Sequence, residues 1–372
     1  MASVTVTIDG KTIDVEPGTT VLDAARRLGI DIPTLCHVEG LEPAASCFLC
    51  AVQVEGARTT SPACALPVSD GMAVATDTPD LRASRRMALE LLLSDHAGDC
   101  IAPCTAGCPA GVDIAGYVYE IASGEVGRAM DILYERLSMP GTLGRICPRL
   151  CEQSCRRGEL DRDGLAIAAL HRYAADRNAA SPEPVVPRAG APTGKSVGIV
   201  GAGPAGLTAA FYLLRRGHAC TLYDPNPHAG GMLRYGIPAY RLPRAALDDE
   251  IATVEGLGAT FRMGTRWGRD FALADLRRDH DAVFVAIGAQ RSSRMRCEGE
   301  DFAVSGLAYL HRVAEGGSPD LGRTVVVVGG GNTAMDAART VARTGADVTV
   351  LYRRTRREMP CLMDEVEGAE EE

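Results

Sequence analysis

Apolar and polar residues alternate near the N-terminus, a pattern that predicts β-strands. Residues 3–8 and 12–15 follow this two-residue period, and Asp9-Gly10 between them is typical of a hairpin turn. A helical pattern follows at residues 20–28. This order predicts a small α+β domain at the start of the chain.

The middle of the chain has helical periodicity instead. Apolar residues recur at three- and four-residue spacing in the segments 82–95, 113–123, 126–137 and 167–175. Residues 179–194 then contain four prolines and no apolar period, which predicts a semi-rigid linker.

From Lys195 onward the pattern changes to short, continuous apolar runs. Residues 196–200 predict a buried parallel strand, a helix follows, and a second strand ends at Asp224. The turn between the first strand and the helix has the spacing G-x-G-x-x-G, which allows a tight turn, close approach of a pyrophosphate and helix–strand packing. Asp224 lies where a carboxylate can accept a hydrogen bond from a ribose hydroxyl. The turn residues are Gly201, Gly203, Pro204, Ala205 and Gly206.

A second nucleotide-binding pattern begins at Thr324. Its turn keeps two glycines and has Ala334 at the third position, where a small residue is permitted. Its second strand ends in Arg353 and Arg354 instead of an acid, and guanidinium groups there suit a ribose 2′-phosphate. This favours NADP(H) over NAD(H), although Arg356 and Arg357 are equally explained as a solvated surface. The turn residues are Gly329, Gly331, Asn332, Thr333 and Ala334.

Composition limits the class of protein. A net charge of −9 and a pI near 5.4 argue against a nucleic acid partner. The sequence has no run long enough to span a membrane and no evident signal peptide, so a cytoplasmic location is expected. Ten of the 13 cysteines lie between residues 36 and 155, which favours metal ligation over disulfides. Cys220, Cys297 and Cys361 are expected to be buried or incidental thiols.

The ten clustered cysteines form two kinds of group. The first has the spacing C-x10-C-x2-C-x13-C, which suits a [2Fe–2S] cluster or, less well, zinc. The second consists of two C-x3-C-x3-C triplets with Cys-Pro pairs, a strong indication of [4Fe–4S] ligation. The first group is Cys36, Cys47, Cys50 and Cys64; the triplets are Cys100, Cys104 and Cys108, and Cys147, Cys151 and Cys155.

Two known families resemble parts of this sequence. The stretch TLCHVEGLEPAASCFLCAVQVEG resembles the ferredoxin-type [2Fe–2S] domain of complex I and hydrogenase subunits, which implies a β-grasp fold. The block CPAGVDIAGYVYEIASGEVGRAMDIL with GRICPRLCEQSCRR resembles the helical domain of the glutamate synthase small subunit, whose relatives usually carry two [4Fe–4S] clusters. Two clusters need eight ligands, so His96 and His171 are candidates beside the six triplet cysteines, and one or two clusters are expected.

The second resemblance continues through the nucleotide region and implies FAD. In that family a Gly-Gly-x-Leu-x-x-Gly-Ile-Pro segment runs along the flavin ring, and a strand ending in a Gly turn leaves the FAD domain. The corresponding residues are Gly231, Met232, Leu233, Gly236 and Ile237, with Gly288 at the turn.

The fold class is accordingly multidomain α/β with α+β. The predicted parts are a β-grasp [2Fe–2S] domain at 1–80, a helical [4Fe–4S] domain at 81–178, a linker at 179–194, a Rossmann-like FAD domain at 195–320 and an incomplete NAD(P)H-binding domain at 321–372. The last part is shorter than in the family, as expected for a fragment, for a chain completed by another subunit or for an abbreviated fold.

These cofactors imply an electron-transfer oxidoreductase in which no side chain acts as acid or base. Electrons from NADPH would pass through FAD to the clusters and on to a larger subunit of glutamate synthase, formate dehydrogenase or hydrogenase type, with no membrane partner. The alternatives are a stand-alone ferredoxin–NAD(P) reductase that serves free ferredoxin, and a non-catalytic iron–sulfur relay without flavin. No C-x-x-C or C-x4-C pair follows Gly206, which argues against a disulfide reductase.

Overall fold

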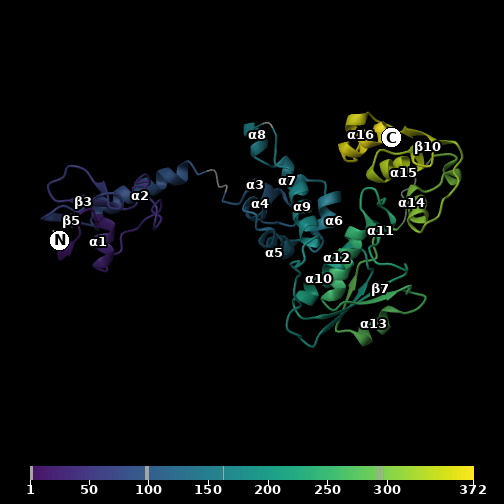
Figure 1. The fold of residues 1–372 in the computed structure, drawn as a ribbon, viewed down its shortest axis with the longest axis horizontal. Coiled ribbons are helices and arrows are strands. Elements are labelled where there is room, and N and C mark those ends of the chain that lie inside the picture. Colours follow the sequence, from purple (N-terminus) through teal and green to yellow (C-terminus); the bar gives the residue numbers. More distant parts are fainter. Residues whose placement is uncertain (1–2, 97–99, 162, 291, 293–294, 296) are drawn as a thin grey trace. The chain divides into compact units, whose positions relative to one another are not determined.

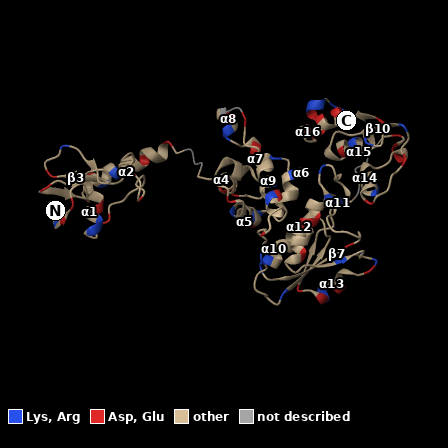
Figure 2. Ribbon diagram, in the orientation of Figure 1, with Lys and Arg blue, Asp and Glu red and all other residues tan. Residues whose placement is uncertain are grey.

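The computed structural model describes residues 3–96, 100–161, 163–290, 292, 295 and 297–372 (Figure 1). The chain divides into two compact units, Met1–Cys100 and Ile101–Glu372. None of the helices in the described ranges is long and apolar enough to cross a bilayer. Acidic and basic residues are interspersed along the described ribbon (Figure 2).

The first unit contains the predicted hairpin and a mixed sheet. Asp9 and Gly10 have positive φ values of 49° and 80°, which match the twist of the two strands they join. The sheet has the order β2-β1-β5-β3-β4, with β1 antiparallel to β2 and parallel to β5. Its strands are β1 (Val4–Ile8), β2 (Lys11–Val15), β3 (Ala51–Val54), β4 (Ser61–Pro62) and β5 (Met72–Ala75).

Two helices complete the first unit. Helix α1 (Val21–Arg27) begins after Thr20, whose hydroxyl accepts a hydrogen bond from the Asp23 amide, and it buries Val21, Leu22, Ala24 and Ala25 against the sheet. Helix α2 (Pro79–Ser94) begins after the capping residue Thr78. Arg85 ties α2 to the sheet by donating to the carbonyl groups of Ala51 and Thr76.

The second unit opens with short helices and continues into a four-stranded parallel sheet of order β8-β7-β6-β9. The opening helices are α3 (Pro103–Gly107), α4 (Ile114–Ala122), α5 (Val126–Arg136), α6 (Pro140–Ile146), α7 (Leu150–Gln153), α8 (Arg157–Asp161) and α9 (Ile167–Ala179). The sheet region comprises β6 (Ser196–Val200), α10 (Pro204–Arg215), β7 (Ala219–Asp224), α11 (Met232–Tyr235), α12 (Arg244–Gly256), β8 (Thr260–Met263), α13 (Leu273–Asp279) and β9 (Ala282–Val285). The predicted Rossmann-like order of elements is confirmed.

A second parallel pair of strands, β10 and β11, has its own small core. Helices α14 and α15 cover one face of this pair, while Val326, Val328 and Leu351 on the other face are more than half exposed. The elements are a short turn of helix at Glu300–Phe302, α14 (Gly306–Ala314), β10 (Thr324–Val328), α15 (Asn332–Ala342), β11 (Asp347–Leu351), a second short turn at Arg356–Glu358 and α16 (Met363–Glu371).

The helical region and the four-stranded sheet region share one hydrophobic core. Buried residues from Val112 to Ala174 and from Val197 to Ala259 form a single cluster. Across this junction the Tyr134 and Phe211 rings lie 6.1 Å apart, and the hydroxyl groups of Ser138 and Thr208 lie 2.8 Å apart. Because both regions contribute apolar side chains to this one core, removing either region would expose apolar side chains of the other to water.

The predicted linker follows a fixed path beside α10. The side-chain amide of Asn178 bonds both the N–H and the carbonyl of Val185. A Cβ at Gly190 would lie 2.5 Å from the Arg215 carbonyl oxygen, so the two backbones are in direct contact. The Gly190 amide also donates to the Leu214 carbonyl and the Thr193 amide to the Gly217 carbonyl, so residues 190–193 are fastened to the end of α10 and the turn after it.

One buried carboxylate also crosses the junction. Glu250 on α12 accepts hydrogen bonds from the amides of Gly141 at 2.6 Å and Thr142 at 2.9 Å, at the N-terminus of α6. Burial is the main cause that raises its pKa to about 7, opposed by these hydrogen bonds and by Arg145. Tyr134 also faces the carboxylate, and burial with the Glu250 charge raises the pKa of Tyr134 to about 12.

This raised pKa predicts a specific pH dependence of stability. Because the folded protein binds the Glu250 proton more tightly than the unfolded chain does, the contribution of Glu250 is largest below pH 4.5 and is lost as the pH rises through about 7. The free-energy advantage of wild type over Glu250→Gln should therefore fall by about 3 kcal/mol across that window. Urea unfolding between pH 5 and 8, followed by circular dichroism, measures most of this change. The exposed neighbour Asp249→Asn controls for the change of net charge, and a constant difference would contradict the prediction.

Candidate functional site

The first glycine-rich turn is compact for steric reasons. A Cβ at Gly206 would lie 1.9 Å from the Gly201 carbonyl oxygen, and one at Gly201 would lie 2.2 Å from the Ala286 carbonyl oxygen. Gly201 also has a φ of 111°. These positions require glycine to pack α10 against β6 and β9.

Gly203 has a different role from the other two glycines. Its Cβ would find no atom nearer than the Gly231 Cα at 3.7 Å, so the protein itself leaves room beside it. Gly203 is also the N-cap of α10, and Pro204 and Ala205 begin the helix. An uncrowded backbone at a helix N-terminus fits the approach of a pyrophosphate.

The predicted flavin segment lies directly beside this turn. Gly230 donates its amide to the Ala202 carbonyl, and a Cβ at Gly231 would approach the Gly203 Cα to 2.7 Å. Met232 and Leu233 begin α11, and Gly236 is its C-cap. Arg244 then fixes the segment by donating to the carbonyl groups of Leu233 and Ile237.

Asp224 lies at the end of β7 next to the same turn and is buried. One carboxylate oxygen accepts from the Ala202 amide at 2.8 Å, and the other accepts from the backbone and side-chain N–H groups of Asn226. The predicted ribose-binding acid therefore also holds the turn, and these three hydrogen bonds leave one of its roughly four lone pairs for a hydroxyl. Gly288 has a φ of 67° and follows β9.

The second glycine-rich turn is also formed. A Cβ at Gly330 would lie 2.7 Å from the Tyr352 ring, whereas one at Gly331 would meet nothing within 4 Å. Gly329 lies against Ala334, and Asn332 and Thr333 begin α15. The side-chain Oδ1 of Asn332 accepts a hydrogen bond from the Leu362 amide, so Asn332 holds the segment before α16.

Arg353 and Arg354 lie just beyond β11, and both are exposed. Arg356, in contrast, is paired with Glu370 at 2.7 Å. The structure thus distinguishes Arg356, a surface ion pair, from the two arginines predicted to bind a 2′-phosphate.

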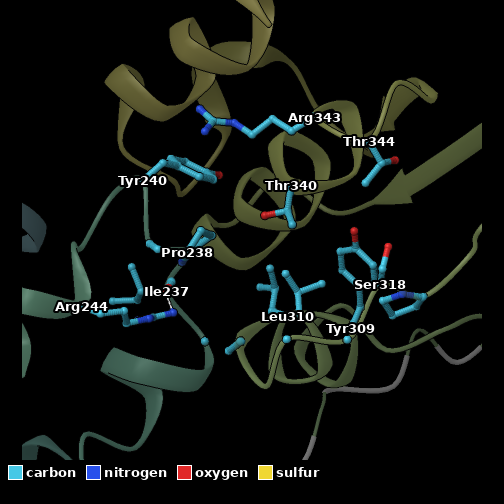
Figure 3. A pocket seen from close by; sticks show the side chains of 17 residues that line it. Ile237, Pro238, Tyr240, Arg244, Tyr309, Leu310, Ser318, Thr340, Arg343 and Thr344 are labelled. Atoms are coloured by element: carbon cyan, nitrogen blue, oxygen red, sulfur yellow. Dashed lines mark hydrogen bonds between the residues drawn. The ribbon is translucent and has the colours of Figure 1, made fainter.

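A cleft of about 580 Å³ separates the segment 236–244 from α14 and α15 (Figure 3). Tyr240 lies under the Arg343 guanidinium, which is 3.7 Å from the ring centroid. Beside it, Arg241 forms buried ion pairs with Asp336 at 2.7 Å and Glu365 at 2.6 Å. Burial raises the pKa of Asp336, against the effect of Arg241. These contacts connect the two nucleotide-binding regions of the second unit.

Four cysteines of the first unit, Cys36, Cys47, Cys50 and Cys64, influence one another electrostatically. Hydrogen bonds from Cys47 and Ser46 lower the pKa of Cys36 to about 7. Burial first, and then the neighbouring thiols of Cys50, Cys36 and Cys47, raise the pKa of Cys64 to about 11. The Cys64 thiol thus lies near enough to the other three to be influenced by each of them, and the four remain the predicted [2Fe–2S] ligands.

The cysteines of the second unit gather around α3 and α7. Burial, followed by the nearby Cys147 and Cys108, raises the pKa of Cys151 to about 11. Cys104 and Cys108 also lie near the buried Tyr117, and a Cβ at Gly107 would lie 2.7 Å from the Ser154 hydroxyl. A Cβ at Gly164 would be 4.0 Å from the Cys155 sulfur, so this loop borders the same region.

The two candidate histidines differ in environment. His171 on α9 is buried, its Nε2 has no hydrogen-bond partner among the described residues, and burial lowers its pKa to about 4. A neutral ring with an unpartnered nitrogen fits a metal-ligand role. His96 lies in the first unit, with Nε2 3.2 Å from the Cys100 sulfur. Among the described residues no group of three or more His, Cys, Asp or Glu side chains is arranged to hold a metal ion.

Sequence reasoning missed Glu250, Arg241 and Asp336. The signal for Glu250 was its place in the helical repeat, because Leu247, Glu250 and Val254 form the buried face of α12. A charged residue on an apolar face needs a partner, but its partner at Gly141 is 109 residues away and could not be found from the pattern.

Comparison with known families covers nearly the whole chain in three segments. Residues 1–79 match a 2Fe-2S iron-sulfur cluster binding domain, and residues 94–182 match dihydropyrimidine dehydrogenase domain II, a 4Fe-4S cluster domain. Residues 195–372 match the pyridine nucleotide-disulphide oxidoreductase family. The fold and these matches therefore define a class of multidomain chain with two iron–sulfur domains and a domain of the pyridine nucleotide-disulphide oxidoreductase type.

Relatives agree with this class. The chain is 43% identical over 283 residues to the NADPH-Fe(3+) oxidoreductase subunit beta of Geobacter sulfurreducens, covering 73% of this chain and 41% of the relative. It is 42% identical to the NADP(+)-dependent formate dehydrogenase subunit beta of Moorella thermoacetica, covering 73% and 42%. With the glutamate synthase [NADPH] small chain of Escherichia coli K12 the identity is 34%, covering 75% and 62%. The predicted resemblance to the glutamate synthase small subunit group is confirmed, and the chain spans under half the length of the first two relatives.

Because Gly206 is crowded and Gly203 is not, alanine at the first position should affect stability and alanine at the second should affect FAD binding. Gly206→Ala forces a backbone overlap and should lower the thermal stability of flavin-free protein. Gly203→Ala fits the free protein, so its melting temperature should stay at the wild-type value, while FAD affinity falls about tenfold or more because the methyl group occupies the phosphate approach. Thermal melts and FAD titrations measure the two effects. Normal FAD binding by Gly203→Ala would place the pyrophosphate elsewhere.

Proposed function

We propose that this chain transfers electrons from NADPH through FAD to iron–sulfur clusters and then to a partner subunit. The observation that carries this proposal is the single hydrophobic core that joins the cysteine-rich helices to the dinucleotide-binding sheet. It keeps the two candidate redox sites in one rigid body. The three relatives described above, whose names include NADPH or NADP(+), support the same electron donor.

The residues present fit a flavin nucleotide. Gly203 leaves space at the N-terminus of α10, Asp224 has one free lone pair beside it, and Arg244 holds the Gly231–Ile237 segment in place. The chemistry that a bound flavin supplies is the exchange of electron pairs with a nicotinamide and of single electrons with iron–sulfur clusters. The task of the chain is to bind and orient these groups.

The cysteines are proposed as cluster ligands in two sets. Cys36, Cys47, Cys50 and Cys64 would hold the [2Fe–2S] cluster of the first unit. The two triplets, with His171 and His96 as further candidates, would hold one or two [4Fe–4S] clusters. Since the named relatives include subunits of larger enzymes, the [2Fe–2S] unit is proposed to pass electrons to a separate subunit.

Cofactor analysis of anaerobically purified protein tests this proposal. About one FAD with roughly six or ten irons per chain is expected, corresponding to one [2Fe–2S] and one or two [4Fe–4S] clusters. NADPH should reduce both flavin and clusters, as followed by absorbance and EPR. Cys50→Ser should lose the [2Fe–2S] signal and retain FAD. Clusters without flavin would contradict the proposal and favour a non-catalytic relay, and rapid reduction of free ferredoxin without a partner would favour a stand-alone reductase.

The two exposed arginines after β11 predict cofactor preference. Replacing Arg353 and Arg354 with alanine should lower kcat/KM for NADPH by about tenfold to a hundredfold, because charge-assisted hydrogen bonds to a 2′-phosphate contribute roughly 1.5–3 kcal/mol. The value for NADH should change little, since NADH lacks that phosphate. Arg356→Ala, which removes only the Glu370 ion pair, is the matched control. An equal loss for both nucleotides would contradict a 2′-phosphate contact.

A further inference from the structure

We propose that Glu250 is a positioning residue for electron transfer between the flavin and the iron–sulfur clusters, an inference that rests on the proposed function. From α12 in the dinucleotide-binding region, its carboxylate holds the N-terminus of α6 in the cysteine-rich region. Through α6 it fixes the placement of Cys147 and His171.

The contact is a helix cap supplied by another region of the unit. Glu250 binds the amides of Gly141 and Thr142 with one oxygen each, while Pro140 has no amide hydrogen and Met139 provides no side-chain cap. A carboxylate at a helix N-terminus satisfies free N–H groups and the helix dipole. The first turn of α6 is therefore anchored from α12.

The other end of α6 leads to the candidate ligands. Cys147 is the C-cap of α6 and donates its amide to the Leu143 carbonyl. One turn earlier, a Cβ at Gly144 would lie 2.8 Å from both His171 Cδ2 and the Arg172 Cα, so α6 and α9 meet at backbone distance. The Leu143 carbonyl also hydrogen-bonds the His171 ring. A shift of α6 therefore moves both Cys147 and His171.

The charges around the carboxylate add to this restraint. Arg145, on α6, donates to the Gly141 carbonyl and to Asp176 on α9, and its side chain is 9% exposed. Glu250 thus faces backbone amides and a nearby guanidinium, with the Tyr134 ring on the side of α5. None of these groups belongs to either glycine-rich turn, and flavin reduction by NADPH is the measurement that checks the nucleotide sites in Glu250 variants.

The test compares Glu250→Gln, Glu250→Asp and Gly141→Ala with the exposed control Asp249→Asn in the full chain. Hydrogen exchange of the peptide covering α6 should accelerate in Glu250→Gln and Gly141→Ala. Dithionite-reduced samples should show altered [4Fe–4S] EPR signals and an unchanged [2Fe–2S] signal. In stopped-flow experiments NADPH should reduce the flavin at the wild-type rate, while cluster reduction slows severalfold, because electron transfer weakens as the redox groups move apart.

Glu250→Asp should recover part of the cluster reduction rate, because it restores the charge one methylene farther away. The proposal would be overturned if Glu250→Gln had wild-type EPR signals and wild-type rates of cluster reduction and only a lower melting temperature. Glu250 would then be a helix cap that stabilises the fold without positioning the ligands. If NADPH fails to reduce the wild-type flavin, the proposed function is wrong. Hydrogen exchange and the dithionite EPR spectra then still decide whether Glu250 positions the cluster ligands.

Discussion

The arrangement of the second unit depends on one buried carboxylate, that of Glu250, which lies where the sheet region contacts the helical region. A buried charge is tolerated only where hydrogen bonds and an opposite charge replace water. Glu250 meets this condition only while α12 and α6 are in register, because its donors are backbone amides that cannot move independently of the helix. The same contact that costs desolvation energy therefore specifies one arrangement of the two regions.

A second buried charge cluster acts in the same way between the two nucleotide-binding regions. Arg241 reaches from the segment after the flavin turn to Asp336 and Glu365, and all three side chains are largely buried. Removal of one partner would leave an uncompensated charge, so such pairs define geometry more than they add stability. The second unit is thus joined at both of its internal boundaries by polar contacts that tolerate little displacement.

Much of the fold follows from the sequence because local sterics determine it. Gly201 and Gly206 can have no side chain where the helix packs on the strands, and Asp9-Gly10 adopts the predicted hairpin turn. The predicted helix after the first turn begins at Pro204, where the missing amide hydrogen is tolerated. Contacts between distant segments, such as Glu250 with Gly141 and Asn332 with Leu362, leave no periodic signal.

The shared core of the second unit also has a consequence for modular assembly. Residues 112–259 bury their apolar side chains together, so the cysteine-rich helices and the dinucleotide-binding sheet form one cooperative folding unit. Residues 4–74 have a separate core of their own. Recombination between related genes would therefore be tolerated near residue 100, where an entire folding unit is exchanged, and penalised near residue 180, where it would cut through a common core.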